Sequence, residues 1–368
     1  MCCIIFRMPG DTKRRGSDRY ILLPSPYRPK YFILARNFRS FQKGLSFYRP
    51  VSFKSLLKRK LILYSFPALS LTGRRVQGEE IIDRLGLRSI KKISQNTGQW
   101  ASLYMPPGGD KVVVQLLNGR EEVFAYMKIG LSESGNERIK REEEALNFLR
   151  EAGFSAFEFP GVLERGTEGE RNFVILTSPP RLEAPRKIAL KFLLPGLRQL
   201  FKLQSKEHEI SNIPHLREIL RKAETYLPKN LQEKFIEILE GLRGLTLPSG
   251  CLHSDFKLWN IFINPSTGKP FVIDWEFFRC GGLPLWDIFC FLLLPRLLVF
   301  PPRSINFRPL LPLLKRSSLA LGFKDLPIEK LFKLYLIDTF LFLENHGHPD
   351  RRTEKTIQNL LSYLKNLR

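Results

Sequence analysis

Residues 251–276 read CLHSDFKLWNIFINPSTGKPFVIDWE, and this stretch decides the fold. Two β-prone runs, Ile261–Ile263 and Phe271–Ile273, are joined by a loop of Asn, Pro, Ser, Thr and Gly. Turn residues of this kind between two β-prone runs predict a β-hairpin. The hairpin places Asn260 at its entrance and Asp274 at its exit, so both side chains can serve one site.

Asp255, Asn260 and Asp274 form a candidate site for phosphoryl transfer. This reaction needs a carboxylate that orients or deprotonates the attacking hydroxyl, and oxygen ligands that hold Mg²⁺ against the phosphates. The spacing therefore predicts Asp255 as the base and Asn260 with Asp274 as metal ligands. Asp and Asn are also common as turn and cap residues, but that alternative does not account for the three spacings together.

The motif HSDFKLWN at residues 253–260, followed by IDWE at residues 273–276, resembles the catalytic and metal segments of the protein-kinase-like fold. In detail it resembles the aminoglycoside phosphotransferase and choline kinase group, which typically reads HGDFxxxN and then IDWE. Protein kinases carry Asp-Phe-Gly at the second motif, so the small-molecule branch is favoured. Ser254 departs from the usual glycine of the group.

The resemblance implies a role for each polar residue of these motifs. Asp255 would accept the proton of the acceptor hydroxyl, and Asn260 and Asp274 would hold Mg²⁺. His253 would support the loop by hydrogen bonding. Lys257 matches a lysine that neutralises charge on the transferring group in Ser/Thr protein kinases, or it is an exposed cation. Downstream, Asp287 would brace the catalytic loop, and a role as a helix N-cap also explains it.

Antiparallel strands are predicted upstream of this motif. Ser102–Met105 and Lys111–Leu117 flank a Pro-Pro-Gly-Gly turn, and Asn118-Gly119 is typical of a type I′ hairpin leading into residues 123–129. Gly108 and Gly109 would let the backbone approach the phosphates of a nucleotide, although any hairpin can carry such a pair.

Lys128 and Glu142 are the predicted clamp on the α and β phosphates, because kinase-like families pair a strand lysine with a helix glutamate. Lys128 lies in the last strand, and a helix is predicted over residues 136–152. Glu143 and Glu144 are as eligible as Glu142 from the sequence alone. Two further strands, Phe159–Leu163 and Asn172–Thr177, lead to a hinge where Leu176 and Thr177 would neighbour the adenine.

The expected fold is therefore α+β, with two lobes of the protein-kinase-like kind: a small antiparallel N-lobe and a large helical C-lobe. The expected domains are a basic N-terminal extension at residues 1–80, the N-lobe at 81–178 and the C-lobe at 179–368. The resemblance implies ATP and Mg²⁺ as cofactors and a hydroxyl of an amino sugar, sugar or amino alcohol as acceptor. It leaves open the preference for ATP or GTP and the oligomeric state.

The net charge of +23 is unusual for a chain of 368 residues. Residues 1–75 contain 17 Lys and Arg against two acidic residues, so most of the charge belongs to this segment. Its apolar residues repeat at helical spacing among the lysines. This pattern is typical of segments that bind an anionic membrane surface or a nucleic acid. A small basic domain packed on its neighbour explains the pattern as well.

Five scattered cysteines and the lack of a long apolar run predict a cytoplasmic protein, peripheral at a membrane if the basic segment binds one. Two other functions remain open. One is an inactive kinase-like protein that binds anions, for which a complete set of catalytic residues is unexpected. The other is a protein kinase, which would carry Asp-Phe-Gly and Ala-Pro-Glu, and the sequence contains neither.

Overall fold

The computed structural model describes residues 5–8, 18–23, 31–34, 38–47, 53–67, 99–105, 109–118, 122–179, 181–299, 307–346 and 351–365. It divides into two compact units. The first comprises Met1–Leu146 and Pro160–Leu182, and the second comprises Asn147–Phe159 and Glu183–Arg368. Gly108 and Gly119 lie outside the described residues.

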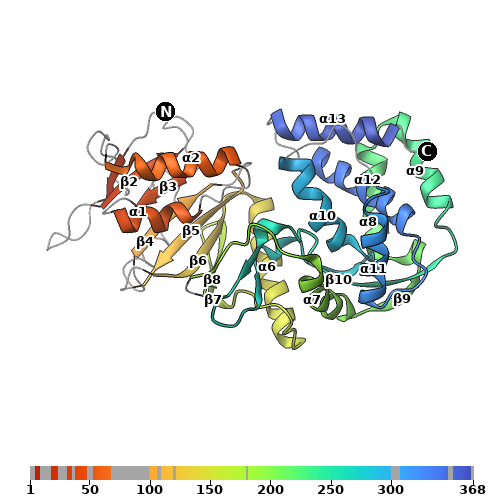
Figure 1. Cartoon of the computed structure of the whole chain (residues 1–368), viewed down its shortest axis with the longest axis horizontal. Helices are drawn as coiled ribbons and strands as arrows, with labels where there is room; N and C mark the ends of the chain where they lie inside the picture. The colour runs from red at the N-terminus through yellow and green to blue at the C-terminus, as the bar shows by residue number, and fades with distance from the viewer. Residues whose placement is uncertain are drawn as a thin grey trace. The chain divides into compact units, whose positions relative to one another are not determined.

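An antiparallel sheet with the strand order β1-β2-β3-β4-β5-β6-β8-β7 forms the centre of the first unit (Figure 1). Its strands are β1 (Ile5–Met8), β2 (Asp18–Leu23), β3 (Tyr31–Leu34), β4 (Gln99–Tyr104), β5 (Lys111–Leu117), β6 (Val123–Gly130), β7 (Val162–Glu168) and β8 (Arg171–Thr177). The helical parts are α1 (Phe38–Gly44), η1 (Leu45–Phe47), α2 (Phe53–Tyr64) and α6 (Glu133–Glu151), whose last turn belongs to the second unit.

The β-branched residues of β5 and the β-branched and aromatic residues of β6 explain why this sheet forms. β5 reads KVVVQLL, and both strands are buried over most of their length, so their side chains pack on both faces. The predicted hairpin between residues 117 and 123 is present, with Leu117 paired to Val123. α6 begins three residues after β6 and packs Ile139, Leu146 and Leu149 in the buried interior.

A separate basic N-terminal extension is not confirmed. β3 pairs with β4, with Phe32 opposite Leu103, so the described strands of residues 1–80 continue the sheet of the first unit. α1 packs on β3 and β4, and Phe41 is fully buried there. β1 also belongs to this sheet, because it pairs with β2 from Ile5 to Met8.

The second unit is mainly helical. Its helices are α7 (Leu190–Lys202), α8 (Pro214–Tyr226), α9 (Lys229–Glu240), α10 (Trp286–Val299), α11 (Leu311–Leu321), α12 (Ile328–His346) and α13 (Arg351–Lys365), with short turns η2 (Ile210–Asn212), η3 (Leu258–Asn260) and η4 (Trp275–Phe277). α12 packs against α8, α9 and α13, and α7 packs against α11. No helix among the described residues is long and apolar enough to span a membrane.

Two small antiparallel sheets of the second unit support the motif region. β11 (Ile261–Ile263) and β12 (Pro270–Val272) form the predicted hairpin. β10 (Thr246–Leu252) pairs with β9 (Lys206–Glu209) on one side and β13 (Arg279–Gly282) on the other. β9 and β13 were not predicted from the sequence, because β9 is polar, β13 is rich in glycine, and neither carries an alternating apolar pattern. β7 begins at Val162, three residues after the predicted start.

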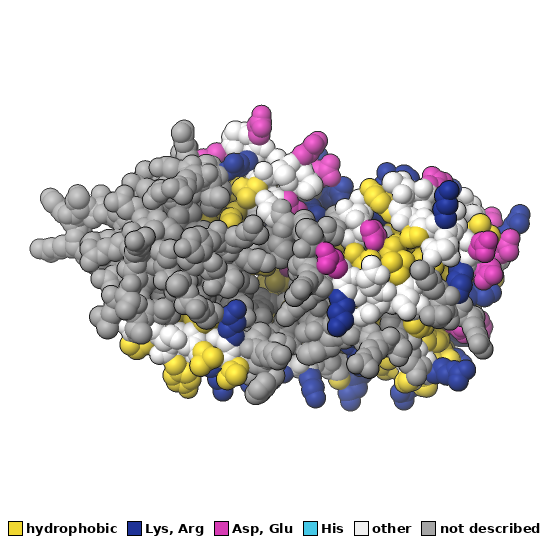
Figure 2. Space-filling model, turned by 90° about the horizontal axis from the view of Figure 1, so that it is seen from above, with side chains coloured by type: hydrophobic (Ala, Val, Ile, Leu, Met, Phe, Trp, Pro, Cys, Tyr) yellow, Lys and Arg dark blue, Asp and Glu magenta, His cyan; other side chains and the backbone are white. Residues whose placement is uncertain are grey.

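The surface of the second unit mixes both signs of charge. On the face drawn in Figure 2, both acidic and basic side chains lie over its described residues. This agrees with the sequence, in which residues 76–368 carry only +8 of the net charge.

Candidate active site

The catalytic loop begins at His253, directly after β10. The hydrogen bonds of this histidine determine which ring nitrogen carries the proton. His253 is fully buried, and its Nδ1 accepts the backbone N–H of Asp255 at 3.2 Å. Nε2 must then carry the proton and donate it to the carbonyl oxygen of Ile273 at 3.0 Å. Burial lowers the pKa of His253 to about 4, so the ring is neutral at pH 7. His253 therefore joins the loop to the end of the hairpin.

Asp287 lies beneath the same loop and accepts two of its backbone N–H groups. Oδ2 accepts the N–H of His253 and Oδ1 accepts the N–H of Ser254, each at 2.8 Å. Burial raises the pKa of Asp287 to about 7, and the two N–H donors act in the opposite direction. The residue lies inside the first turn of α10, so the structure shows the brace and not an N-cap.

Asp255 is held between a lysine and an amide. Lys257 Nζ lies 2.6 Å from Asp255 Oδ1, and Asn260 Nδ2 donates to Asp255 Oδ2 at 2.9 Å and to the Asp255 carbonyl at 3.0 Å. Burial raises the pKa of Asp255 above its ordinary value, although the Lys257 ammonium opposes this rise. Burial alone would lower the pKa of Lys257, but Asp255 outweighs it and the pKa is raised. Lys257 is thus a charged partner of Asp255, not an exposed cation.

The hairpin brings Asp274 next to this group. The N–H of Ile273 donates to the carbonyl of Asn260 at 3.0 Å. This hydrogen bond joins the two ends of the hairpin at the residue that precedes Asp274. Asp274 itself adopts a left-handed conformation with φ 64° and ψ 58°. Burial sets the direction of the pKa shifts at His253 and Asp255, and the charge of Asp274 pushes both pKa values upward. Asp255 and Asp274 therefore belong to one electrostatic site.

The donor set suits a hard divalent cation. Asn260 uses its amide nitrogen to donate to Asp255, and its amide oxygen is the atom that can act as a metal ligand. No group of three or more His, Cys, Asp or Glu side chains in the described part of the chain is arranged to hold a metal ion. Mg²⁺ does not need such a group, because waters and substrate phosphates complete its shell around one or two protein ligands.

Lys128 and Glu142 form a buried ion pair in the first unit. Lys128 Nζ lies 2.7 Å and 2.6 Å from the two carboxylate oxygens of Glu142, which is fully buried. Glu143 instead bonds Arg165, and Glu144 lies on the surface, 3.8 Å from Lys140. The helix register left open by the sequence is thereby resolved in favour of Glu142.

The other predicted nucleotide contacts lie in the first unit as well. Gly109 has φ 69° and is exposed, and Asp110 beside it pairs with Arg138 of α6 at 2.9 Å. Leu176 is buried within β8. Thr177 ends β8, and its Oγ1 accepts the N–H of Gly161 at 2.7 Å. Their contact with a nucleotide stays a prediction.

Sequence reasoning missed a group of charged residues on the far side of the catalytic loop. Arg279 of β13 donates from Nε to Ser254 Oγ at 3.1 Å and from Nη1 to Glu218 of α8 at 2.7 Å. His215 of α8 and Trp286 both donate to Asp338 Oδ2, at 3.3 Å and 3.0 Å. Only the departure at Ser254 was visible in the sequence as a signal for this group.

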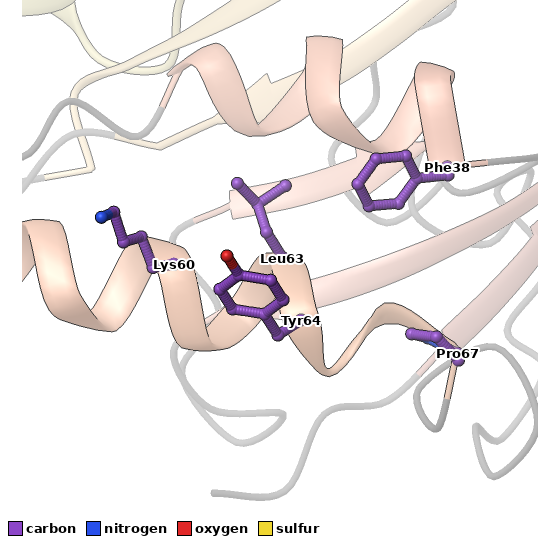
Figure 3. A pocket seen from close by; sticks show the side chains of 5 residues that line it. All are labelled: Phe38, Lys60, Leu63, Tyr64 and Pro67. Atoms are coloured by element: carbon purple, nitrogen blue, oxygen red, sulfur yellow. The ribbon is translucent and has the colours of Figure 1, made fainter.

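A pocket of about 400 Å³ lies in the first unit, away in the sequence from every predicted site residue (Figure 3). Phe38, Lys60, Leu63, Tyr64 and Pro67 line it. It holds no carboxylate, and therefore it is not the site of the chemistry.

Comparison with known proteins agrees with the motif region. Residues 127–309 match the model of a family described as the phosphotransferase enzyme family. This stretch of the chain, 183 of 368 residues, is similar to the phosphotransferase enzyme family. It contains Lys128, Glu142 and the whole catalytic segment, and with the two units above it confirms the α+β, protein-kinase-like fold. The coarse activity that follows is phosphoryl transfer.

Solved structures of aminoglycoside phosphotransferases are similar to this chain. APH(3'')-Id from Streptomyces rimosus, solved with ADP and streptomycin, is 14% identical, with a TM-score of 0.46 over 75% of this chain and 99% of its own. The GDP complex of aminoglycoside 2'-phosphotransferase-IIIa is 13% identical, with a TM-score of 0.49 over 76% and 98%. No curated protein matches the chain in sequence. Identities of this size do not identify an acceptor.

Proposed function

We propose that this protein transfers the γ-phosphoryl group of ATP to a hydroxyl of a small molecule of the amino sugar, sugar or amino alcohol type. The observation that carries the proposal is Asp255, half-buried beside Lys257 and Asn260 on a loop whose backbone is held by Asp287. A family match alone would not distinguish an active protein from an inactive one. A base in this setting supports activity.

In the proposed reaction, the acceptor hydroxyl donates a hydrogen bond to Asp255. Its oxygen forms the new bond to the γ-phosphorus, the bond between the γ-phosphorus and the β–γ bridging oxygen breaks, and ADP leaves with that electron pair. Asp255 takes the hydroxyl proton, and Lys257 offsets negative charge on the transferring group. The raised pKa of Asp255 brings its basicity closer to neutral pH, where proton transfer is most efficient.

Asn260 and Asp274 would hold Mg²⁺, which when bound neutralises charge on the phosphate oxygens. Lys128, oriented by Glu142, would contact the α and β phosphates. Gly108 and Gly109 would approach the phosphates by their backbone, and Leu176 and Thr177 would neighbour the base. The buried Lys128–Glu142 pair supports this assignment, because the carboxylate 2.6 Å away fixes the position of the lysine in the strand.

A screen of acceptors tests the proposal. The purified protein is incubated with Mg·ATP and, separately, with amino sugars, choline-like amines, sugars and nucleosides, and ADP release is measured. We expect at least one class to raise ADP release above the rate without acceptor, and D255N to abolish the increase. ADP release that is the same with and without every acceptor, or that survives in D255N, would contradict the proposal.

We also propose that the surface formed by Phe38 of α1 and by Leu57, Lys60, Leu61 and Tyr64 of α2 contacts an anionic lipid bilayer. Leu57, Leu61 and Tyr64 are 50%, 58% and 81% exposed and share one face of α2, with Lys60 between them. No acidic residue occurs from residue 19 to residue 78. Both the exposed apolar side chains and the positive charge favour binding to a bilayer, since apolar side chains insert at the interface while lysines contact the lipid phosphates. Binding to nucleic acid would be favoured by the positive charge alone.

Vesicle co-sedimentation tests this surface. We expect binding to phosphatidylcholine vesicles that contain phosphatidylglycerol, little binding to pure phosphatidylcholine, and a loss of about tenfold in L61D. L319D is the matched control, because Leu319 is 64% exposed in the second unit. Equal binding by L61D and L319D, or salt-sensitive binding to duplex DNA without binding to vesicles, would overturn the assignment.

A further inference from the structure

Ser254 adopts a backbone conformation that favours glycine. Its φ is 64°, in the left-handed region where a Cβ crowds the neighbouring carbonyl oxygen. The residue directly precedes Asp255, so this turn decides where the carboxylate points. A serine here is strained, and another part of the structure must hold the turn in place.

Arg279 holds the turn through a hydrogen bond to the hydroxyl oxygen of Ser254, an atom that glycine lacks. Its Nε donates to Ser254 Oγ at 3.1 Å, while the N–H of Ser254 donates to Asp287 on the other side. The guanidinium is itself fixed, because Nη1 donates to Glu218 at 2.7 Å and Glu218 also pairs with Lys222 at 2.7 Å.

The strand pairing places Arg279 for this task. β13 runs antiparallel to β10, and Arg279 is the partner of Leu252, the last residue of β10 before the loop. The arginine therefore approaches the turn from the strand that flanks it, while Glu218 approaches from α8. All of these residues belong to the second unit.

We propose that Arg279 is a positioning residue for the base: held by Glu218, it keeps Ser254 in the left-handed turn that presents Asp255 to the acceptor hydroxyl. The inference rests on the proposed function for its kinetic consequence, but the hold on the turn is a property of the fold. A chain with glycine at this position would not need the arginine, because glycine adopts the turn without strain.

A double-mutant cycle between residues 254 and 279 tests the proposal in the full chain. We expect R279Q to lower kcat about tenfold, with KM for ATP nearly unchanged, since misplacing the base slows only the chemical step. In the S254G background, R279Q should change kcat by less than about twofold, because there is no serine left to hold. R217Q is the matched control, since Arg217 lies beside Glu218 on α8 but bonds Ser211 and Asn212.

Hydrogen exchange of the loop amides gives a readout that needs no acceptor. R279Q should speed exchange of the peptide over residues 251–260 in the Ser254 protein more than in S254G, and R217Q should leave it unchanged. If no acceptor is phosphorylated but this coupling appears, the proposed function fails and the positioning role stands. An equal effect of R279Q in both backgrounds, on kcat or on exchange, would overturn the inference.

Discussion

Asp255 and Asp287 show how two carboxylates in one small region take different tasks. Asp287 is surrounded by backbone donors and points into the protein, so it shapes the loop. Asp255 faces a lysine and an amide and retains partial access to solvent. The difference lies in the hydrogen-bond partners, not in the residue type. Burial raises the pKa of both groups, and only Asp255 is placed to meet a substrate.

Substitution of the base should remove activity without unfolding the protein. We expect D255N to lower kcat by about 10²- to 10⁴-fold, because the amide cannot accept the hydroxyl proton, while its oxygen still accepts one hydrogen bond. Steady-state kinetics and a thermal melt measure the two effects. D325N is the control, since Asp325 is exposed and also has a positive φ. A D255N protein with activity within a few fold of the parent would reduce Asp255 to a structural role.

The pKa shifts of His253 and Asp287 predict opposite effects of pH on stability. The pKa of His253 falls from 6.5 to about 4, so its contribution is present above pH 6.5 and is lost as pH falls toward 4. The pKa of Asp287 rises from 3.8 to about 7, so its contribution is present below pH 3.8 and is lost as pH rises toward 7.

Single variants should separate these two titrations. As pH falls from 6.5 to 5, the free energy of unfolding of D287N should decrease, because His253 still titrates, and that of H253N should increase, because Asp287 still titrates. Each group contributes at most one proton, so the two slopes should differ by as much as about 2.7 kcal/mol per pH unit. Urea unfolding at pH 5, 5.75 and 6.5 measures the two slopes. Parallel slopes would show that neither group titrates as its surroundings indicate.

At the scale of elements, α6 has the task of presenting one glutamate among three. Glu142 lies on the buried face, one turn before Leu146, while its two neighbours face arginine or solvent. Successive side chains point in different directions around a helix axis, and of these three glutamates only Glu142 projects toward β6. The ion pair with Lys128 joins α6 to the strand that carries the proposed phosphate contact.

Breaking this pair should affect nucleotide binding and stability together. We expect E142Q to destabilise the protein by about 3 kcal/mol, because the buried Lys128 loses its carboxylate partner. Binding of a non-hydrolysable Mg·ATP analogue should weaken about tenfold or more. Thermal melts with and without the analogue measure both. E144Q, on the exposed face, is the matched control, and equal effects of the two variants would contradict the assignment.

The sequence predicted those elements that carry a period or a turn signal. The β5–β6 hairpin and the β11–β12 hairpin were predicted to within two residues, since turn residues between two β-prone runs mark each of them. β9 and β13 were missed, because polar and glycine-rich strands are defined by their partners and not by their own pattern. Arg279 was missed for the same reason.

The site shows the same division. Asp255, Asn260 and Asp274 were found because their spacing along the chain is itself the signal. The choice of Glu142 over Glu143 and Glu144 needed the helix register, which a sequence gives only to within a residue or more. The bond between Arg279 and Ser254 joins residues 25 positions apart in separate elements, and no local pattern announces it.

At the scale of the molecule, the first unit extends beyond the strands that the motifs require. β4 would be the last strand of the sheet without the N-terminal residues, and β3 covers its outer side from Tyr31 to Ile33. Ile33, Phe41 and Leu45 are fully buried. The N-terminal segment is thus part of the packing that supports β5 and β6.

Removal of this segment should destabilise the first unit. A chain that begins at residue 81 loses β1–β3 and α1, and we expect its first unfolding transition to fall by about 10 °C or more, since several buried side chains lose their cover. Differential scanning calorimetry measures the shift. A chain that begins at residue 17 keeps β2 and β3 and serves as control. Identical transitions in the two truncated chains would show that residues 17–80 are dispensable.

The strand order of the first unit has a consequence for how the protein is made. From β1 to β6 the order in the sheet is the order in the chain, so each strand that leaves the ribosome meets the previous one as a ready template. Only β7 and β8 arrive out of turn, since β8 pairs with β6 and β7 closes the far side. The sheet can therefore grow vectorially during translation, before the catalytic segment has been synthesised.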